Sequence, residues 1–251
     1  MKVVAFTDLD GTILDKNYSF QKVYPTVISL LSLDVAIVFC SSKTKSEIEF
    51  YRKEMNIHDP FVSENGGAIF IPKNYFRLND FTRETKEYYV FELGIEYSKL
   101  RQKIEKITSK SGSKIMGFGD MSIDEIAKST GLTLKMAEMA KQREYDEPFE
   151  LEGDESKFLD AAKEEGLLVT KGDRYYHLSG QHNKGDAVSR LRLLYAKNFE
   201  QIHTIGVGNG QNDMSLLAAV DSPFFIKEEE SIEKIWGKVM SEVKKKALQG
   251  F

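Results

Sequence analysis

Residues 3–14 read VVAFTDLDGTIL, a run of apolar and β-branched residues that ends at two aspartates. Residues 3–7 have the length and β-branched content of a buried strand, and we expect them to form a central parallel strand. Side chains two positions apart point to the same side of an extended chain, so Asp8 and Asp10 should present both carboxylates where the strand ends. Gly11 then permits a sharp turn. Ligands of open α/β sheets bind at this end of the strands, so the aspartates predict a site there, although a solvated Asp-rich turn has the same local pattern.

The composition fits a folded enzyme of one large or two modest domains. The chain has 251 residues, 41% of them hydrophobic and 29% charged, and its formal net charge is −4. This balance argues against disorder and against a nucleic-acid partner. The sequence shows neither a run of about 18 apolar residues nor the pattern of a signal peptide, so we expect no membrane association and a cytoplasmic monomer or dimer. Cys40 is the single cysteine, which excludes an internal disulfide bond and a multi-thiolate metal site.

A second apolar run, residues 35–40, predicts a strand beside the first. It is followed by Ser41, Ser42 and two more polar residues, and then by an amphipathic helix over 45–55. A hydroxyl group at the carboxyl end of a neighbouring strand can hydrogen-bond a phosphate oxygen, helped by the amino end of the helix. Simple capping of that helix, worth about 1 kcal/mol, also explains the polar run.

Two later stretches carry polar groups at the ends of predicted elements. Lys184 lies in the first turn of a helix expected to run to about Tyr195. The helix dipole disfavours a cation there, so we expect an anion beside Lys184 unless it is an ordinary surface lysine. Further on, a predicted strand runs into GNGQND, residues 208–213. The oxygen groups of this segment suit Mg²⁺, although a turn followed by a helix cap explains them as well.

The character of the chain changes between these motifs. Residues 1–80 and 178–251 contain the long apolar strands, whereas residues 81–177 contain amphipathic helices and short, half-exposed strands. The alternation of strands and helices predicts an α/β fold. We expect a Rossmann-like, doubly wound parallel-sheet core made by the two outer segments, with an inserted α+β cap domain.

Two hairpins and one half-exposed strand are expected around the start and end of the insertion. ENGG at residues 64–67 has the glycines of a turn between two strands. A strand is expected over 88–92, inside the insertion. A second hairpin, over residues 167–178, is expected to turn at Gly172 and Asp173.

The four motifs stand in the order that defines a known superfamily. DLDGT at residues 8–12, Ser41, Lys184 and GNGQND resemble the four motifs of the haloacid dehalogenase superfamily of phosphatases and phosphotransferases. The insertion resembles the large α/β cap of one of its subfamilies, in which a segment like ENGG borders the active site. This resemblance implies that Asn65 contacts the substrate. The strings SSKT, QREYDEPF and HNKGDAV further resemble the mannosyl-3-phosphoglycerate phosphatase family.

The resemblance implies a Mg²⁺-dependent phosphatase that hydrolyses a small phosphorylated sugar or glycerate through an aspartyl-phosphate. Asp8 would be the nucleophile, and Asp10 would protonate the leaving oxygen and then activate water. The implied phosphate-binding residues are Ser41, Ser42, Lys184 and Asn212. The implied metal ligands are Asp8, the carbonyl group of Asp10, Asn209 and Asp213.

Substrate specificity is expected from the inner face of the cap. Arg143 is a candidate for binding the glycerate carboxylate and Glu147 for binding sugar hydroxyls, although salt bridges within the cap explain both residues. Asn209 departs from the superfamily, which often has Asp at this position. An amide oxygen can still bind Mg²⁺, but one negative charge is lost, so we expect a lower metal affinity.

Three other functions fit the same motifs. One is another sugar-phosphate phosphatase, resembling sucrose-phosphate phosphatase. A second is a phosphotransferase resembling phosphomannomutase, which would need a bisphosphate activator and release little free phosphate. A third is a non-catalytic phosphate-binding module, which is suggested only by Asn209.

Overall fold

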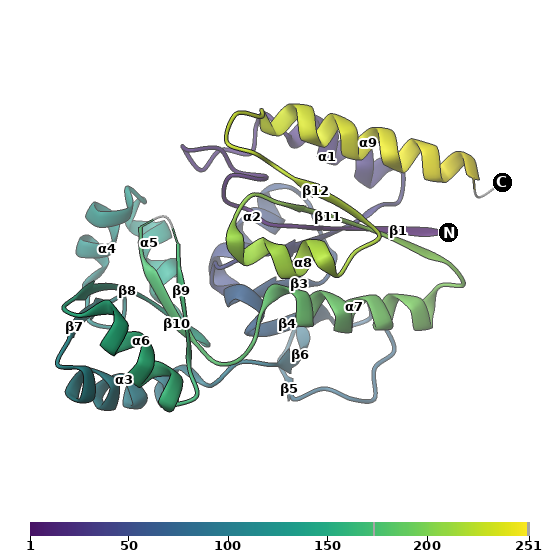
Figure 1. Ribbon diagram of the computed structural model, residues 1–251. Helices are drawn as coiled ribbons and strands as arrows, with labels where there is room; N and C mark the ends of the chain where they lie inside the picture. The colour runs from purple at the N-terminus through teal and green to yellow at the C-terminus, as the bar shows by residue number, and fades with distance from the viewer. Residues whose placement is uncertain (173, 250–251) are drawn as a thin grey trace.

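The computed structural model describes residues 1–172 and 174–249 of the chain. Its strands form two separate sheets, one of eight strands and one of four, and Figure 1 shows them as two units side by side. At the second expected hairpin, Gly172 donates its N–H to the carbonyl oxygen of Tyr175, while Asp173 lies outside the described residues. Within the described ranges, no helix is both long and apolar enough to cross a membrane.

The strand expected at residues 3–7 lies in the middle of the larger sheet. β1 (Lys2–Thr7) pairs in parallel with β11 (Ile202–Gly208) on one side and with β2 (Ala36–Cys40) on the other. The sheet order is β12-β11-β1-β2-β3-β4-β6-β5, and the strands from β12 to β3 in this order are parallel. The remaining strands are β12 (Ser222–Phe225), β3 (Phe61–Ser63), β4 (Ala68–Pro72), β6 (Tyr88–Glu92) and β5 (Arg83–Glu84).

Helices cover both faces of this sheet. Alternate residues of a strand point to opposite sides, and both sides of these strands carry apolar residues that need to be buried. Val3 and Ala5 of β1 pack in one buried cluster, and Val4 and Phe6 pack in another. The first face is covered by α1 (Tyr24–Ser32), α2 (Lys45–Glu54) and α9 (Ile232–Gln249), and the second by α7 (Lys184–Asn198) and α8 (Met214–Ala218). The expected doubly wound α/β core is therefore confirmed.

The strand expected over 88–92 belongs to the core and not to the insertion, which corrects the sequence prediction. β6 pairs antiparallel with β4 along its whole length, and β5 continues the same sheet. Three of its five residues are buried, and Tyr89, which is partly exposed, stacks on the loop residue Phe81. Strand pairing thus moves the start of the insertion from residue 81 to beyond Glu92.

The inserted segment forms the four-stranded antiparallel sheet, with the order β7-β8-β10-β9. Its strands are β7 (Lys114–Gly117), β8 (Asp146–Glu152), β10 (Tyr176–Ser179) and β9 (Leu168–Lys171). Its helices are α3 (Tyr97–Ser111), α4 (Ile123–Thr130), α5 (Leu134–Lys141) and α6 (Glu155–Glu164). The expected α+β cap is confirmed, and because β10 pairs within it, the core resumes beyond Ser179 and not at residue 178.

One face of the cap sheet is covered by α3 and α6, while α4 and α5 pack with Phe118 and Tyr175 beside the ends of β7 and β10. Phe149 of β8 and Leu178 of β10 pack with the apolar residues of α3 and α6. In Figure 1, these two helices lie together on one side of the cap, and α4 and α5 lie on another. Residues that alternate with Phe149 and Leu178 along the strands point to the opposite side, which we call the open face.

Candidate active site

Asp8 and Asp10 lie at the carboxyl end of β1. The N–H of Asp8 donates to the carbonyl oxygen of Val207 at 3.0 Å, which extends the ladder between β1 and β11 past the strand end. Gly11 has a φ of 69°, and its N–H closes the turn on the carbonyl oxygen of Leu14. The side chain of Asp8 is 9% exposed and that of Asp10 is 43% exposed. One carboxylate is therefore enclosed by the protein, while the other reaches the surface.

Lys184 reaches the enclosed carboxylate from the first turn of α7. Its ammonium group donates to Oδ1 of Asp8 at 2.8 Å and to Oδ1 of Asp213 at 2.6 Å, and its side chain is fully buried. Two carboxylates thus offset the cation that the helix dipole disfavours at this position. The expectation of an anion beside Lys184 is confirmed, and its interpretation as a surface lysine is wrong.

The three side chains carry more negative than positive charge. Burial and the neighbouring Asp213 raise the pKa of Asp8 to about 7, and Lys184 opposes this rise. Burial favours the neutral form of Lys184, but the two flanking carboxylates raise its pKa above the ordinary value. Lys184 therefore stays charged, whereas Asp8 needs additional positive charge nearby to be fully ionised at neutral pH.

Asp213 orders the segment that follows β11. Its Oδ2 accepts the backbone N–H groups of Asn209 and Gly210, each at 2.9 Å, while its Oδ1 accepts from Lys184. A Cβ on Gly208 would lie 2.5 Å from the Cβ of Asp213, so the segment folds this tightly only with glycine there. Both oxygens of Asp213 are engaged by protein donors. Asp213, which was expected to bind metal, therefore supports this loop and Lys184.

Oxygen groups that suit Mg²⁺ gather at the turn after β1. The side chain of Asn209 lies against Gly11, where a Cβ would come within 2.3 Å of Nδ2, and Oδ1 of Asn209 accepts from the Thr12 hydroxyl at 3.2 Å. Oδ1 of Asp10 is buried without a hydrogen-bond partner among the described residues. With Asp8, these residues supply two carboxylates and an amide, a donor set that fits Mg²⁺ with its retained waters.

This donor set includes an amide because few acids lie at the site and both oxygens of Asp213 already accept hydrogen bonds from the protein. Among residues 1–172 and 174–249, no cluster of three or more His, Cys, Asp or Glu side chains is arranged to hold a metal ion. A Mg²⁺ site here would therefore use the oxygen of Asn209 and a backbone carbonyl oxygen beside the two aspartates.

The polar run after β2 caps its helix through one residue and leaves the others for the site. Thr44 is the N-cap of α2 and forms a reciprocal capping box with Glu47. Ser41 is fully buried, and its hydroxyl accepts the N–H of Lys43 at 3.3 Å. The carbonyl oxygen of Ser42 accepts from an arginine of the cap. Capping thus accounts for Thr44, and the two serines need another explanation.

Lys43 is a site residue that the sequence reasoning missed. Its ammonium group lies 2.9 Å from Oδ2 of Asp10 and 3.6 Å from Glu47, and its side chain is 7% exposed. Burial favours its neutral form, but Asp10 and Glu47 raise the pKa of Lys43 above the ordinary value. The available signal was its place in a polar run at the end of a strand next to the first one. Each of the two aspartates thus contacts one ammonium group, which it shares with a second acid.

The segment ENGG joins the core to the cap. It forms a 3-10 turn, Glu64–Gly66, between the antiparallel strands β3 and β4, so the expected hairpin is confirmed. The carboxylate of Glu64 accepts the backbone N–H groups of Glu144, Tyr145 and Asp146 at 2.8 to 3.1 Å. Sequence reasoning missed Glu64, because its partners lie about 80 positions away. This buried residue fixes the start of β8 against the core.

Asn65, next to Glu64, connects the cap to the fourth motif. Its φ is 57°, a left-handed backbone conformation. Nδ2 of Asn65 donates to Oδ2 of Asp146 at 3.2 Å, and Oδ1 accepts from Nδ2 of Asn212 at 3.0 Å. The structure therefore brings the predicted residues Asn65 and Asn212 together.

Arg143 lies at the same junction. Its Nε donates to the carbonyl oxygen of Asp146, and its Nη2 lies 3.1 Å from both Oδ1 of Asp146 and the carbonyl oxygen of Ser42. The side chain is 3% exposed. The guanidinium group is thus held between the cap and the strand end that carries Ser41, close to the predicted phosphate site.

Glu147 lies on the opposite side of the cap sheet, so the structure does not bring it to the site. Its carboxylate accepts from the hydroxyl of Tyr97 at 2.5 Å, from Arg101 at 3.1 Å and from the N–H of Gly119 at 3.0 Å. Tyr97 and Arg101 belong to α3, which covers the sheet face away from the open one. Alternation along β8 explains this, because Asp146 and Glu147 must point to opposite faces.

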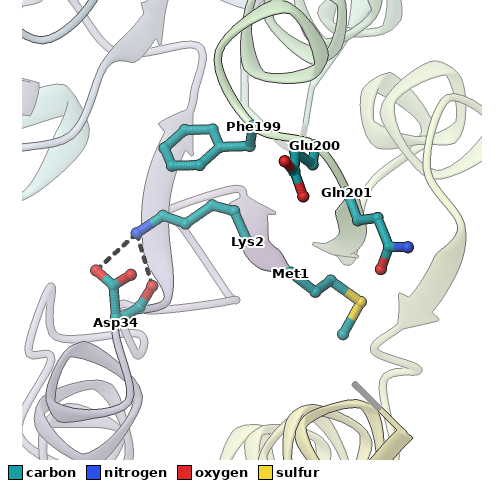
Figure 2. Close-up of a pocket in the computed structure, with 6 residues that line it drawn as sticks. All are labelled: Met1, Lys2, Asp34, Phe199, Glu200 and Gln201. Carbon is teal, nitrogen blue, oxygen red and sulfur yellow. Dashed lines mark hydrogen bonds and ion pairs between the residues drawn. The ribbon is translucent and has the colours of Figure 1, made fainter. Parts of the chain in front are cut away.

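A shallow pocket at the other end of the large sheet offers a contrast. Figure 2 shows its lining, in which the ammonium group of Lys2 binds the carboxylate and the carbonyl oxygen of Asp34 beside Phe199. The pocket lies at the amino ends of the strands, opposite to the end where Asp8 and Asp10 lie. Its lysine is already paired with an exposed acid, so the pocket does not match the enclosed, unbalanced arrangement around Asp8.

Comparisons with known proteins find relatives that match most of the chain. The chain is 44% identical to the glucosyl-3-phosphoglycerate/mannosyl-3-phosphoglycerate phosphatase of Methanococcoides burtonii, over 91% of this chain and 86% of that protein. It is 36% identical to the mannosyl-3-phosphoglycerate phosphatase of Pyrococcus horikoshii, over 88% and 89%.

A solved structure shows the same fold at low sequence identity. The haloacid dehalogenase-like hydrolase from Bacteroides thetaiotaomicron matches 95% of this chain and 100% of its own, with a TM-score of 0.64 and 16% identity. Residues 5–231 match the family described as haloacid dehalogenase-like hydrolases. Because this match spans most of the chain, and Lys184 lies between Asp8 and Asp213 beneath an inserted cap sheet, the chain belongs to this hydrolase family.

Proposed function

We propose that this protein is a Mg²⁺-dependent phosphatase that hydrolyses mannosyl-3-phosphoglycerate, and its glucosyl analogue, to the glycosylglycerate and phosphate. The observation that carries the proposal is the enclosed carboxylate of Asp8, held 2.8 Å from the ammonium group of Lys184 at the carboxyl end of the central strand. The substrate assignment is supported by the names of two relatives that are 44% and 36% identical over about 90% of the chain.

Asp8 acts as the nucleophile in this proposal. A carboxylate oxygen of Asp8 attacks phosphorus, the bond from phosphorus to the glycerate oxygen breaks, and Asp10 gives its proton to that leaving oxygen. Asp10 then takes a proton from water, which attacks the aspartyl-phosphate and releases phosphate. Asp8 is regenerated, and Asp10 is protonated again for the next cycle.

Positive charge makes the attack of an anion on a phosphate dianion feasible. Lys184 remains charged between Asp8 and Asp213, and Ser41, Ser42 and Asn212 bind the phosphate oxygens. Asp8, the carbonyl oxygen of Asp10 and Asn209 would hold Mg²⁺, which would neutralise phosphate and carboxylate charge. Asp213 acts on the metal site by holding the backbone of Asn209.

The cap determines which phosphate ester reaches Asp8. The inserted segment closes over the substrate and excludes water, as cap and lid domains do. Arg143 binds the glycerate carboxylate through the guanidinium N–H groups that do not bind Asp146 or Ser42. Asn65 positions the substrate beside Asn212. The burial of Glu147 on the other face of the cap sheet leaves it a support for the cap.

Phosphate release across a panel of substrates tests the proposal. The purified protein with Mg²⁺ is given mannosyl-3-phosphoglycerate, its glucosyl analogue, sucrose phosphate, mannose phosphates and p-nitrophenyl phosphate. We expect kcat/KM to be highest for the two glycosyl-3-phosphoglycerates. A preference for another sugar phosphate contradicts the substrate assignment, and phosphate release only in the presence of a bisphosphate activator identifies a phosphotransferase. No release from any substrate identifies a non-catalytic module.

A further inference from the structure

The open face of the cap sheet carries a paired aspartate and histidine that the mechanism above does not use. Asp146 lies on β8 and His177 on β10, and the imidazole Nδ1 lies 2.9 Å and 3.1 Å from the two carboxylate oxygens. Tyr176 and Leu178 pack with α3 and α6, so His177 between them points to the open face.

Asp146 is fully engaged and is a support for other groups. It is 0% exposed, and its oxygens also bind Nη2 of Arg143 and Nδ2 of Asn65. Burial favours its neutral form, but the neighbouring His177 and Arg143 lower the pKa of Asp146 below the ordinary value. Asp146 therefore remains a charged acceptor that fixes the orientation of His177.

The second ring nitrogen of His177 lies beside Gly172. Nδ1 is taken up by Asp146, and Nε2 has no hydrogen-bond partner among the described residues, while the side chain is 18% exposed. A carboxylate that accepts Nδ1–H leaves a lone pair on Nε2, so the neutral ring accepts a hydrogen bond from a hydroxyl group. Through Asp146 and Asn65 the ring is connected by hydrogen bonds to Asn212 of the core.

We propose that His177, oriented by Asp146, is a specificity-determining residue that accepts a hydrogen bond from a hydroxyl of the sugar in the substrate. This inference rests on the proposed function, because it assigns one contact of the same substrate. The phosphate lies at Asp8 and the glycerate carboxylate at Arg143, so the sugar lies farther out, where the open face offers His177. Glu147, expected for this task from the sequence, points to the other face.

Kinetics of His177→Ala on substrates with and without the sugar test the inference. We expect kcat/KM for mannosyl-3-phosphoglycerate to fall about 10- to 100-fold, mainly through KM, as for the loss of a hydrogen bond to a substrate hydroxyl. Hydrolysis of p-nitrophenyl phosphate, and competitive inhibition by 3-phosphoglycerate, should stay within about twofold of wild type. His177→Phe should behave like His177→Ala, and His177→Gln should recover part of the loss. His58→Ala is the matched control, because His58 is exposed and bonds only Asn56 among the described residues.

The outcomes separate this inference from the proposed function. Equal losses on both kinds of substrate, or no loss on either, overturn the role of His177 while the phosphatase assignment stands. A wild-type protein that does not hydrolyse mannosyl-3-phosphoglycerate overturns both. If His177→Ala does not fold, the comparison of His177→Gln with His177→Phe decides the question with side chains that fill the same space.

Discussion

Two buried charge clusters lie close together in this protein, and they differ in the direction in which the pKa of their central aspartate is shifted. In the catalytic cluster, Lys184 lies between Asp8 and Asp213, and burial with the nearby Asp213 raises the pKa of Asp8 to about 7. In the junction cluster, Asp146 lies among Arg143 and His177, and its pKa is lowered even though burial opposes this.

The difference indicates what each cluster is for. A cluster short of positive charge is stabilised by a divalent cation and can direct a carboxylate at phosphorus, which fits a catalytic role. In the second cluster, Arg143, His177 and Asn65 all contact Asp146, which stays charged and holds two parts of the molecule in a fixed arrangement. We therefore expect changes in the first cluster to affect chemistry, and changes in the second to affect substrate binding and stability.

Asp8→Asn should have the largest effect of any single change. Removing the nucleophile prevents formation of the aspartyl-phosphate, so phosphate release should fall by about 10⁴-fold or more. The folded structure should persist, because the amide has the same shape and removes a repulsion with Asp213. Single-turnover phosphate release, with near-ultraviolet circular dichroism to verify the fold, measures this. Full activity in Asp8→Asn would contradict the proposed mechanism.

Lys184→Met should be the next largest change. The variant leaves Asp8 and Asp213 facing each other without their shared cation, so we expect about a 10³-fold loss in kcat, by analogy with loss of one charge-stabilising group. Breaking a buried ion pair also costs about 3 to 5 kcal/mol of folding free energy. Lys197→Met, an exposed lysine of the same helix, is the matched control in kinetics and in denaturant unfolding. A kcat within tenfold of wild type would show that Lys184 is not part of the catalytic cluster.

Acid should weaken the junction cluster selectively. The pKa of Asp146 is lowered in the folded protein, so its contribution to stability is present above its unfolded pKa, near 3.9, and is lost as the pH falls through the folded value. Asp146→Asn should be less stable than wild type at pH 6, and the difference in unfolding free energy should shrink below about pH 4. Urea unfolding between pH 3 and 7 measures it, with the exposed Asp160→Asn as control. A constant difference across this range would exclude Asp146 as the titrating group.

Arg143→Lys should have a smaller effect on activity, through substrate binding and not through the chemical step. Lysine keeps the charge but loses the planar arrangement that reaches Asp146, Ser42 and a carboxylate together. We expect KM for mannosyl-3-phosphoglycerate to rise about 10- to 100-fold with little change in kcat. Arg77→Lys, an exposed arginine outside the junction, is the control. A fall in kcat with an unchanged KM would place Arg143 with the catalytic cluster.

The catalytic cluster could be predicted from the sequence because its parts follow strand ends. Asp8 shares one side of a strand end with Asp10, and Lys184 is a cation where the helix dipole disfavours one, so both positions indicate a site. The order of the four motifs then identifies that site. The doubly wound core followed from apolar runs such as residues 3–7. Lys43 was not predicted, because nothing local distinguishes it from the other polar residues around it.

The junction cluster could not be predicted, because its contacts join positions far apart. Glu64 binds the backbone of residues 144–146, and no local pattern reveals such a pairing. Whether Asp146 or Glu147 faces the open side of the cap sheet depends on how β8 is oriented. Two adjacent acids in a sequence do not reveal that orientation. β6 was placed in the wrong sheet for a similar reason, since its partner β4 is known only from the fold.

Asn209→Asp should have the smallest effect. It adds a negative charge to the catalytic cluster, which already has more negative than positive charge, and so tests the contrast with the junction cluster. The side chain lies over Gly11 at the predicted metal site, so a carboxylate there should bind Mg²⁺ more tightly. We expect the Mg²⁺ concentration for half-maximal activity to fall roughly tenfold, about 1.4 kcal/mol, with kcat at saturating Mg²⁺ unchanged. Without metal, the added charge should lower the unfolding temperature, and Mg²⁺ should raise it more in the variant than in wild type. Thermal unfolding with and without Mg²⁺ measures this independently of activity, and Asn198→Asp at the exposed end of α7 serves as control. If the Mg²⁺ dependence of the variant equals that of wild type, Asn209 does not bind the metal, and the imbalance around Asp8 is relieved elsewhere.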